Sequence, residues 1–176
     1  DPAMRLPHAY ADTFTGLSYL WEGNPAKAMA VLQPRLEQAE REVGRRSIVA
    51  AVLAGPLAAA FFLRGESERV LATLADRLDV IERTGLPDSV ILAYRALAGV
   101  ALWDGDEARS LDLLAALQEQ GVARDVPRMV LTSLVDQARL HASRGRVQTA
   151  SELLAQIDAL RTVFEQPAYR TMLAHF

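Results

Sequence analysis

The segment Trp103-Asp104-Gly105-Asp106 has three counterparts in the chain: Trp21-Glu22-Gly23-Asn24, Leu63-Arg64-Gly65-Glu66 and Ser143-Arg144-Gly145-Arg146. Their glycines are 42, 40 and 40 residues apart, and an apolar helical stretch precedes and follows each one. Glycine readily ends a helix because it adopts the left-handed conformation that costs other residues energy. The spacing therefore predicts a repeat of about forty residues, built from a helix, a tight turn and a second helix.

Positions at fixed distances from these glycines support the repeat. Small residues stand seven positions before them, and leucines stand nine positions after them. The small positions are Gly16, Ala58, Ala98 and Ala138, and the leucines are Leu32, Leu74, Leu114 and Leu154. Five positions after the glycines stand Ala28, Val70, Ser110 and Ala150. Small residues let two helices cross closely and the leucine fills the gap toward the next unit, which is the packing pattern of tetratricopeptide repeats.

The predicted fold is all-α, a right-handed superhelical solenoid of about four tetratricopeptide-like hairpins. Helices are expected at 7–22, 25–43, 46–64, 67–84, 88–103, 107–120, 127–144 and 147–164, and no strand is expected because no segment alternates with a period of two. The units are 6–44, 45–85, 86–125 and 126–166, in one domain over 5–176 with a partial fifth unit from 167. Residues 1–4 are expected to be a remnant of an expression vector. The length beyond an ordinary unit of about 34 residues is expected between one hairpin and the next.

Composition restricts the partners. The net charge of −3 offers no positive field for a phosphate backbone, so direct contact with nucleic acid is not expected. The absence of cysteine fits a reducing compartment, and we expect a cytoplasmic protein. Residues 48–63 are uncharged and rich in alanine. Because a spanning helix needs about 20 apolar residues, this segment is interpreted as a helix buried on all sides, with no membrane partner.

Units two and three carry a family resemblance. Its residues are 59–66 (Ala-Ala-Phe-Phe-Leu-Arg-Gly-Glu), 82–88 (Glu-Arg-Thr-Gly-Leu-Pro-Asp) and 92–98 (Leu-Ala-Tyr-Arg-Ala-Leu-Ala), followed by Gly105-Asp106. With the forty-residue spacing, they resemble the sensor region of the large ATP-dependent, MalT-type LuxR transcription activators. The resemblance implies a helical-repeat sensor that receives an inducer. A nucleotide-binding module and a DNA-binding helix-turn-helix would lie elsewhere in such a regulator, so no cofactor is expected in this segment.

The resemblance also implies a ligand-binding groove on the first helix of each hairpin. Its exposed positions would stand thirteen, ten, six, three and two residues before the turn glycine. The candidate residues are Tyr10, Thr13, Leu17, Trp21, Phe62, Leu63, Arg95, Leu102, Trp103 and Arg139. Such a face suits a mostly apolar inducer, a small molecule or a peptide, with one anionic group held by an arginine. The other domains of the regulator are alternative partners, and self-association is left open.

No catalytic or metal site is predicted. The three histidines, His8, His141 and His175, lie in different units, and none has a second ligand at metal-binding spacing. An enzyme is therefore not expected. Two hypotheses remain: the sensor domain of a cytoplasmic regulator, and a free-standing adaptor that scaffolds protein partners. The length of the parent chain would distinguish them.

Overall fold

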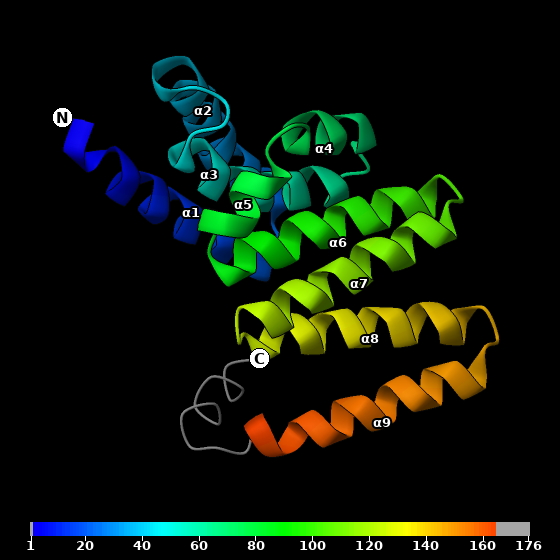
Figure 1. Cartoon of the computed structure of the whole chain (residues 1–176). Coiled ribbons are helices and arrows are strands. Elements are labelled where there is room, and N and C mark those ends of the chain that lie inside the picture. Colours follow the sequence, from blue (N-terminus) through cyan, green and yellow to red (C-terminus); the bar gives the residue numbers. More distant parts are fainter. Residues whose placement is uncertain (1, 165–176) are drawn as a thin grey trace. The chain divides into compact units, whose positions relative to one another are not determined.

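A computed structural model describes residues 2–164 of the chain, and within this range the chain is all-helical, without strands (Figure 1). The helices are a short 3-10 turn η1 (Pro2–Met4), α1 (Arg5–Trp21), α2 (Pro25–Val43), α3 (Ile48–Leu63), α4 (Ser67–Leu74), α5 (Leu78–Thr84), α6 (Pro87–Trp103), α7 (Glu107–Ala123), α8 (Pro127–Ser143) and α9 (Val147–Phe164). The partial unit expected from residue 167 lies outside the described residues.

The four turn glycines all adopt the predicted left-handed conformation. Their φ angles are 71° at Gly23, 74° at Gly65, 82° at Gly105 and 72° at Gly145. At Gly65, for example, the glycine N–H donates to the Phe62 carbonyl at 2.9 Å, and the next N–H donates to the Phe61 carbonyl at 3.0 Å. The same pair of bonds closes the other three turns. This Schellman geometry satisfies carbonyl groups that a helix end leaves free, and it confirms the helix-turn-helix unit.

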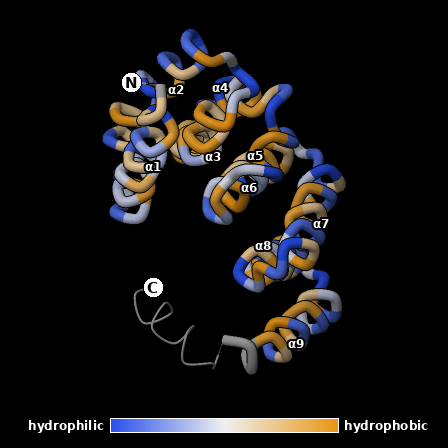
Figure 2. Tube along the Cα trace, turned by 60° about the vertical axis from the view of Figure 1, so that its left-hand side comes forward, coloured by the Kyte–Doolittle hydropathy of each residue, from blue (hydrophilic) through white to orange (hydrophobic). Residues whose placement is uncertain are grey.

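The described residues form two compact units, one up to residue 113 and one from residue 114 onward. In the first unit, α3 packs against α1, α2, α4, α5 and α6. Every residue from Ala50 to Phe61 is consequently buried, which explains why this helix lacks a polar face. Figure 2 shows hydrophobic colours along α3. None of the helices between residues 2 and 164 combines the length and hydrophobicity that a bilayer-spanning segment requires.

The second unit contains the end of α7 with α8 and α9, and its apolar cluster joins the last two. Leu134, Ala138 and Leu153 are buried there, with Val130, Ile157 and Leu160 packed against them. Leu154 was expected to fill this gap, but its side chain is 56% exposed and Leu153 takes the buried place. The one-residue difference turns the predicted leucine outward, because neighbouring positions on a helix lie about 100° apart.

The predicted helix 67–84 is wrong in its continuity, because it breaks into α4 and α5 at residues 75–77. Asp76 adopts a φ of 55° at the break. Two arginines from the α2–α3 loop hold the freed backbone: Arg45 Nη2 donates to the Ala75 carbonyl at 3.0 Å, and Arg46 Nη1 donates to the Asp76 carbonyl. The guanidinium groups replace the hydrogen bonds that the helix loses, which allows the break.

The location of the extra repeat length also differs from the expectation. The connections between hairpins are short, from Val43 to Ile48, from Thr84 to Pro87 and from Ala123 to Pro127. The helices themselves are long, at 16 to 19 residues wherever they are unbroken. The additional residues therefore extend the helices, where they form hydrogen bonds, and do not lengthen the loops.

Candidate functional site

Three apolar side chains are exposed at the same repeat position of the first unit. Trp21, Leu63 and Trp103 each stand two residues before a turn glycine, and their exposed fractions are 60%, 59% and 83%. They end α1, α3 and α6, and α3 packs against both of the other helices. We call these three residues the apolar edge. A concentration of large exposed apolar groups on one unit is a common mark of an interaction site.

The direction of α3 and α6 places their last residues at the same end of the unit. Near its start, α6 contacts α3 through the Ser89 hydroxyl, which donates to the Val52 carbonyl at 3.3 Å. Near the other end, the Phe62 ring lies where a Cβ at Gly99 would be. The two helices therefore run parallel with a constant offset, so Leu63 and Trp103 lie at the same end of the unit. Figure 1 shows α1, α3 and α6 within this unit.

Phe62 and Leu102 lie next to the apolar edge in sequence and are half-buried, so each keeps part of its apolar surface accessible. The missing side chain at Gly99 makes room for the Phe62 ring between α3 and α6. Tyr10, near the start of α1, is also half-buried. These three predicted residues can therefore contribute apolar surface, although less than the residues of the edge.

Two predicted groove residues, Thr13 and Leu17, are not on the surface. Both side chains are fully buried, and the Thr13 hydroxyl donates to the Val52 carbonyl of α3 at 3.2 Å. The stripe of α1 that contains them faces its neighbouring helices, since α1 packs on both α2 and α3. Their assignment as exposed groove positions is therefore corrected: they stabilise helix packing and cannot touch a ligand on an open face.

The two predicted anion-binding arginines lie in different units. Arg95 is exposed on α6 in the first unit. Arg139 is exposed on α8 in the second unit, where its Nη1 lies 3.7 Å from the Asp136 carboxylate. Arg95 shares its helix with Trp103 and is therefore the arginine that we associate with the apolar edge.

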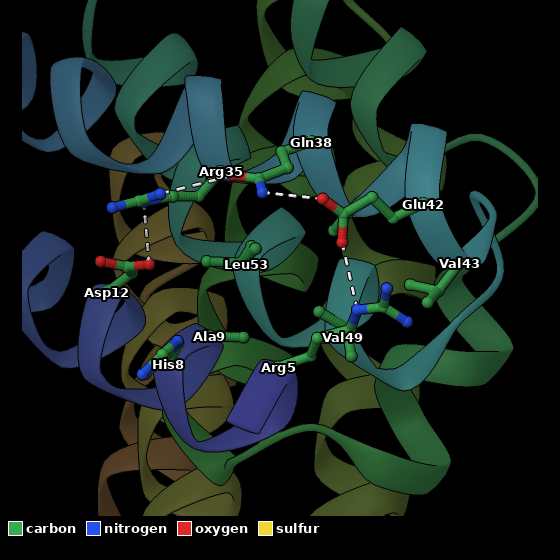
Figure 3. Close-up of a pocket in the computed structure, with 11 residues that line it drawn as sticks. Arg5, His8, Ala9, Asp12, Arg35, Gln38, Glu42, Val43, Val49 and Leu53 are labelled. Carbon is green, nitrogen blue, oxygen red and sulfur yellow. Dashed lines mark hydrogen bonds and ion pairs between the residues drawn. The ribbon is translucent and has the colours of Figure 1, made fainter. Parts of the chain in front are cut away.

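A second candidate site, which the sequence analysis did not predict, is a pocket between α1, α2 and α3 with a volume of about 100 Å³ (Figure 3). We call it the first-hairpin pocket. Its lining residues are Arg5, His8, Ala9, Asp12, Arg35, Gln38, Ala39, Glu42, Val43, Val49 and Leu53. Charged and amide groups of α1 and α2 surround an apolar centre that includes Ala9 and Leu53.

Two ion pairs join the helices around this pocket. Arg35 Nε lies 3.2 Å from Asp12 Oδ2, and Arg5 Nε lies 3.1 Å from Glu42 Oε2. The Gln38 amide donates to Glu42 Oε1 at 2.8 Å. This hydrogen bond, with the charge of Arg5, lowers the pKa of Glu42 below its ordinary value, since both contacts favour the ionised carboxyl. The Glu42 carboxylate of the pocket therefore carries its charge at neutral pH.

A repeat comparison would have revealed this pocket from sequence. In the first repeat hairpin, His8 and Asp12 stand fifteen and eleven residues before the turn glycine. The other three hairpins have only uncharged residues at these positions, nearly all of them apolar and most fully buried. The His8 position holds Ala50, Val90 and Val130, and the Asp12 position holds Ala54, Tyr94 and Leu134. The repeat was established from its small and leucine positions, and none of these positions changes from uncharged to charged between hairpins.

No metal site emerges from the described residues. Within this part of the chain, no three histidine or acidic side chains gather in a way that could hold a metal ion. The His141 ring takes part in a hydrogen bond, since its Nδ1 accepts from Arg146 Nε at 2.7 Å. His175 lies outside the described residues. The arrangement is suited to binding by the apolar edge and by the first-hairpin pocket.

Comparison with known proteins gives no relative from which a role could be transferred. The chain matches no protein family model, no curated protein sequence and no solved structure.

Proposed function

We propose that this chain is a ligand-sensing domain of helical repeats that recognises a mostly apolar ligand or peptide through the apolar edge. The supporting observation is the exposure of Trp21, Leu63 and Trp103 at one repeat position of three helices. Phe62 and Leu102 extend this surface, and Arg95 supplies a positive charge for an anionic group. The proposal includes the right-handed superhelical stacking of the hairpins expected for tetratricopeptide-like repeats.

The energetics of the edge favour moderate affinity. Burying one large apolar side chain contributes about 1.5–3 kcal/mol, so the three residues contribute roughly 5–9 kcal/mol before any cost. Association costs about 4 kcal/mol or more in lost freedom of motion. The edge alone therefore gives weak binding, and micromolar affinity requires the additional surface of Phe62 and Leu102 or the charge of Arg95.

The wider role that we propose is sensing in a cytoplasmic, MalT-type LuxR regulator. It rests on the resemblance carried by residues 59–66, 82–88 and 92–98. A ligand that binds one arrangement of the repeats more tightly would shift the population toward it, and linked domains would respond. A phosphate-binding loop upstream and a helix-turn-helix downstream in the same gene would support this role, and a short gene containing only the repeats would contradict it.

One observation favours the adaptor as a second candidate. Trp103 is 83% exposed, so the apolar edge is an open surface and not an enclosed cavity. Enclosed pockets are typical of small-molecule sites, whereas open apolar surfaces with aromatic anchors are typical of protein interfaces. A polypeptide segment would then be the ligand, with Trp21 and Trp103 as anchors.

Fluorescence can test the apolar edge. The probe is 8-anilinonaphthalene-1-sulfonate, which combines apolar rings with one anionic group and fluoresces in apolar surroundings. Trp21 and Trp103 are the only tryptophans of the chain, so binding at the edge should quench their emission. Leu63→Ala and Trp103→Ala should each weaken dye binding about tenfold, which corresponds to about 1.4 kcal/mol and agrees with the loss of one apolar contact. Arg95→Ala should weaken it less.

The matched control is Leu154→Ala on α9, since Leu154 and Leu63 have nearly equal exposed fractions. This variant should bind the dye like the unaltered chain. If Leu154→Ala weakens binding as much as Leu63→Ala does, or if neither edge variant has an effect, the apolar edge is not the binding surface.

A further inference from the structure

We propose that the first-hairpin pocket binds a small free amino acid as its zwitterion. In this arrangement, Asp12 accepts hydrogen bonds from the ligand's ammonium group and Arg35 donates to its carboxylate. The ligand side chain lies on the apolar floor of the pocket. The proposal does not depend on the apolar edge, which is formed by other residues.

The fold does not need an acidic residue at the Asp12 position. At the Asp12 position, the other three hairpins have Ala54, Tyr94 and Leu134, and all three are buried. At the position of Arg35, the second hairpin has Arg77, which is fully buried and bonds Glu40, whereas the third and fourth have the apolar residues Leu117 and Ile157. An uncharged residue at the Asp12 position of the first helix is therefore the ordinary solution. A charged pair there contributes little stability, which leaves ligand binding as a reason for its presence.

The Asp12–Arg35 pair has hydrogen-bonding capacity beyond its mutual contact. Arg35 contacts Asp12 through Nε at 3.2 Å and the Gln38 carbonyl through Nη1 at 3.4 Å. A guanidinium group has five N–H donors, so Nη2 can donate twice to a carboxylate. Asp12 meets Arg35 through Oδ2, so Oδ1 can accept from an ammonium group. The pair thus offers a donor and an acceptor side by side, as the head group of an α-amino acid requires.

The charged groups of the pocket balance one another. Two arginines and two carboxylates line the pocket, so their formal charges cancel. A ligand with one net charge would leave that charge uncompensated, whereas a zwitterion meets both signs and adds none. His8 and Gln38, between the two pairs in sequence, provide further polar contacts for the head group.

The size and floor of the pocket define the ligand further. The floor includes Ala9, Ala39 and Leu53, all buried, and the half-buried Val49. One water needs about 10–15 Å³ of such volume, so 100 Å³ holds roughly seven to ten non-hydrogen atoms. This range fits amino acids with small aliphatic side chains. The Arg5–Glu42 pair stands seven residues from Asp12 and Arg35 on each helix, about 10 Å away, and limits the length of the ligand.

Calorimetry and amide NMR spectra of the whole chain test the proposal. The probes are L-valine, L-tryptophan, acetate and methylammonium, each added up to about 10 mM, which detects binding as weak as millimolar. L-Valine should bind and should shift the amide signals of residues around Asp12 and Arg35. L-Tryptophan should not bind because it exceeds the volume, and the two single-charge probes should not bind because each satisfies only half of the pair.

Substitutions of Asp12 and Arg35 test whether these residues bind the head group of the ligand. Asp12→Asn and Arg35→Gln should each weaken L-valine binding at least tenfold, because a hydrogen bond to a charged group contributes about 1.5–3 kcal/mol. The matched control is Arg83→Gln, which breaks the exposed Arg83–Asp79 pair outside the pocket and should leave binding unchanged. Circular dichroism should show the same helical content in all three variants.

Several outcomes would overturn the proposal. They are the absence of L-valine binding at the highest concentration, acetate binding as tight as L-valine binding, and undiminished binding by folded Asp12→Asn. Loss of L-valine binding in Trp103→Ala would transfer the ligand to the apolar edge and would also reject the pocket. Because the dye experiment uses that edge alone, failure of either proposal can be distinguished from failure of the other.

Discussion

Gly55→Ala should be strongly destabilising, although alanine is the better helix former. Gly55 lies inside α3, where α6 crosses it. A Cβ at this position would overlap the Ser89 carbonyl oxygen and lie 2.9 Å from the carbonyl carbon. Both obstacles are backbone atoms, which cannot rotate away. The two helices would have to separate by roughly 1 Å to restore ordinary contact distances, because carbon atoms pack best at about 3.5–4.0 Å.

The magnitude follows from three contributions. Overpacking against backbone costs up to about 3 kcal/mol. The hydrogen bond from the Ser89 hydroxyl to the Val52 carbonyl, 3.3 Å long, would be stretched, at a cost of about 1 kcal/mol. Replacing glycine by alanine in a helix returns about 1 kcal/mol. The free energy of unfolding should thus fall by about 3 kcal/mol, which lowers Tm by about 6–12 °C in a chain of this size.

Urea denaturation followed by circular dichroism measures this loss. The control is Gly99→Ala on α6, where the three atoms nearest to the added Cβ all belong to the Phe62 ring. That ring is half-buried and can rotate toward solvent, so the loss should stay below about 1 kcal/mol once the gain in helix propensity is included. If Gly55→Ala unfolds within about 0.5 kcal/mol of the unaltered chain, a close backbone approach is not what requires glycine there.

Three further predictions concern a helix end, a buried charge and acid. Asp125 ends α7 with a φ of 52°, so Asp125→Gly should raise the free energy of unfolding by about 0.5–1 kcal/mol in urea denaturation; a decrease would show that the aspartate is unstrained. Arg77 is fully buried, bonds Glu40 through Nη2, and has no partner for Nε and Nη1 among the described residues. In thermal unfolding, Arg77→Leu should therefore leave the free energy of unfolding nearly unchanged. Glu40→Gln should lower it by about 3 kcal/mol, because only this variant leaves a buried charge unpaired. Equal losses in the two variants would contradict this reasoning. The hydrogen bond from Arg69 lowers the pKa of Glu66 in the folded chain, so this contact stabilises the fold above the ordinary pKa of 4.5 and is lost as the pH falls below it. Glu66→Gln should therefore flatten the acid side of the plot of unfolding free energy against pH. An unchanged plot would exclude the contact.

The candidate sites were only partly predictable. The exposure of Trp21, Leu63 and Trp103 agrees with their proposed groove positions, whereas Thr13 and Leu17 at other groove positions are buried. All five are uncharged and lie on first helices of hairpins. Which of them meets solvent depends on how each first helix rotates against its neighbours, and residue spacing does not specify this rotation.

The first-hairpin pocket was missed for a related reason. Asp12 and Arg35 stand 23 residues apart, and neither forms a motif with its own neighbours. Helix packing brings them to 3.2 Å. Only the comparison of equivalent repeat positions, where the other units have uncharged residues in place of Asp12, marks the pair as unusual.

The local structure of the chain is encoded in residues close together in the sequence. A glycine at positive φ and two backbone hydrogen bonds define each turn, and these depend on residues adjacent in the chain, so the turns at Gly23, Gly65, Gly105 and Gly145 are encoded locally. The tertiary structure alone decided the break at residues 75–77 and the first-hairpin pocket. Both depend on guanidinium groups that reach partners more than twenty residues away, as Arg45 does to Asp76 at 2.7 Å. Such contacts are long-range because packing, and not local conformational preference, brings the charges together.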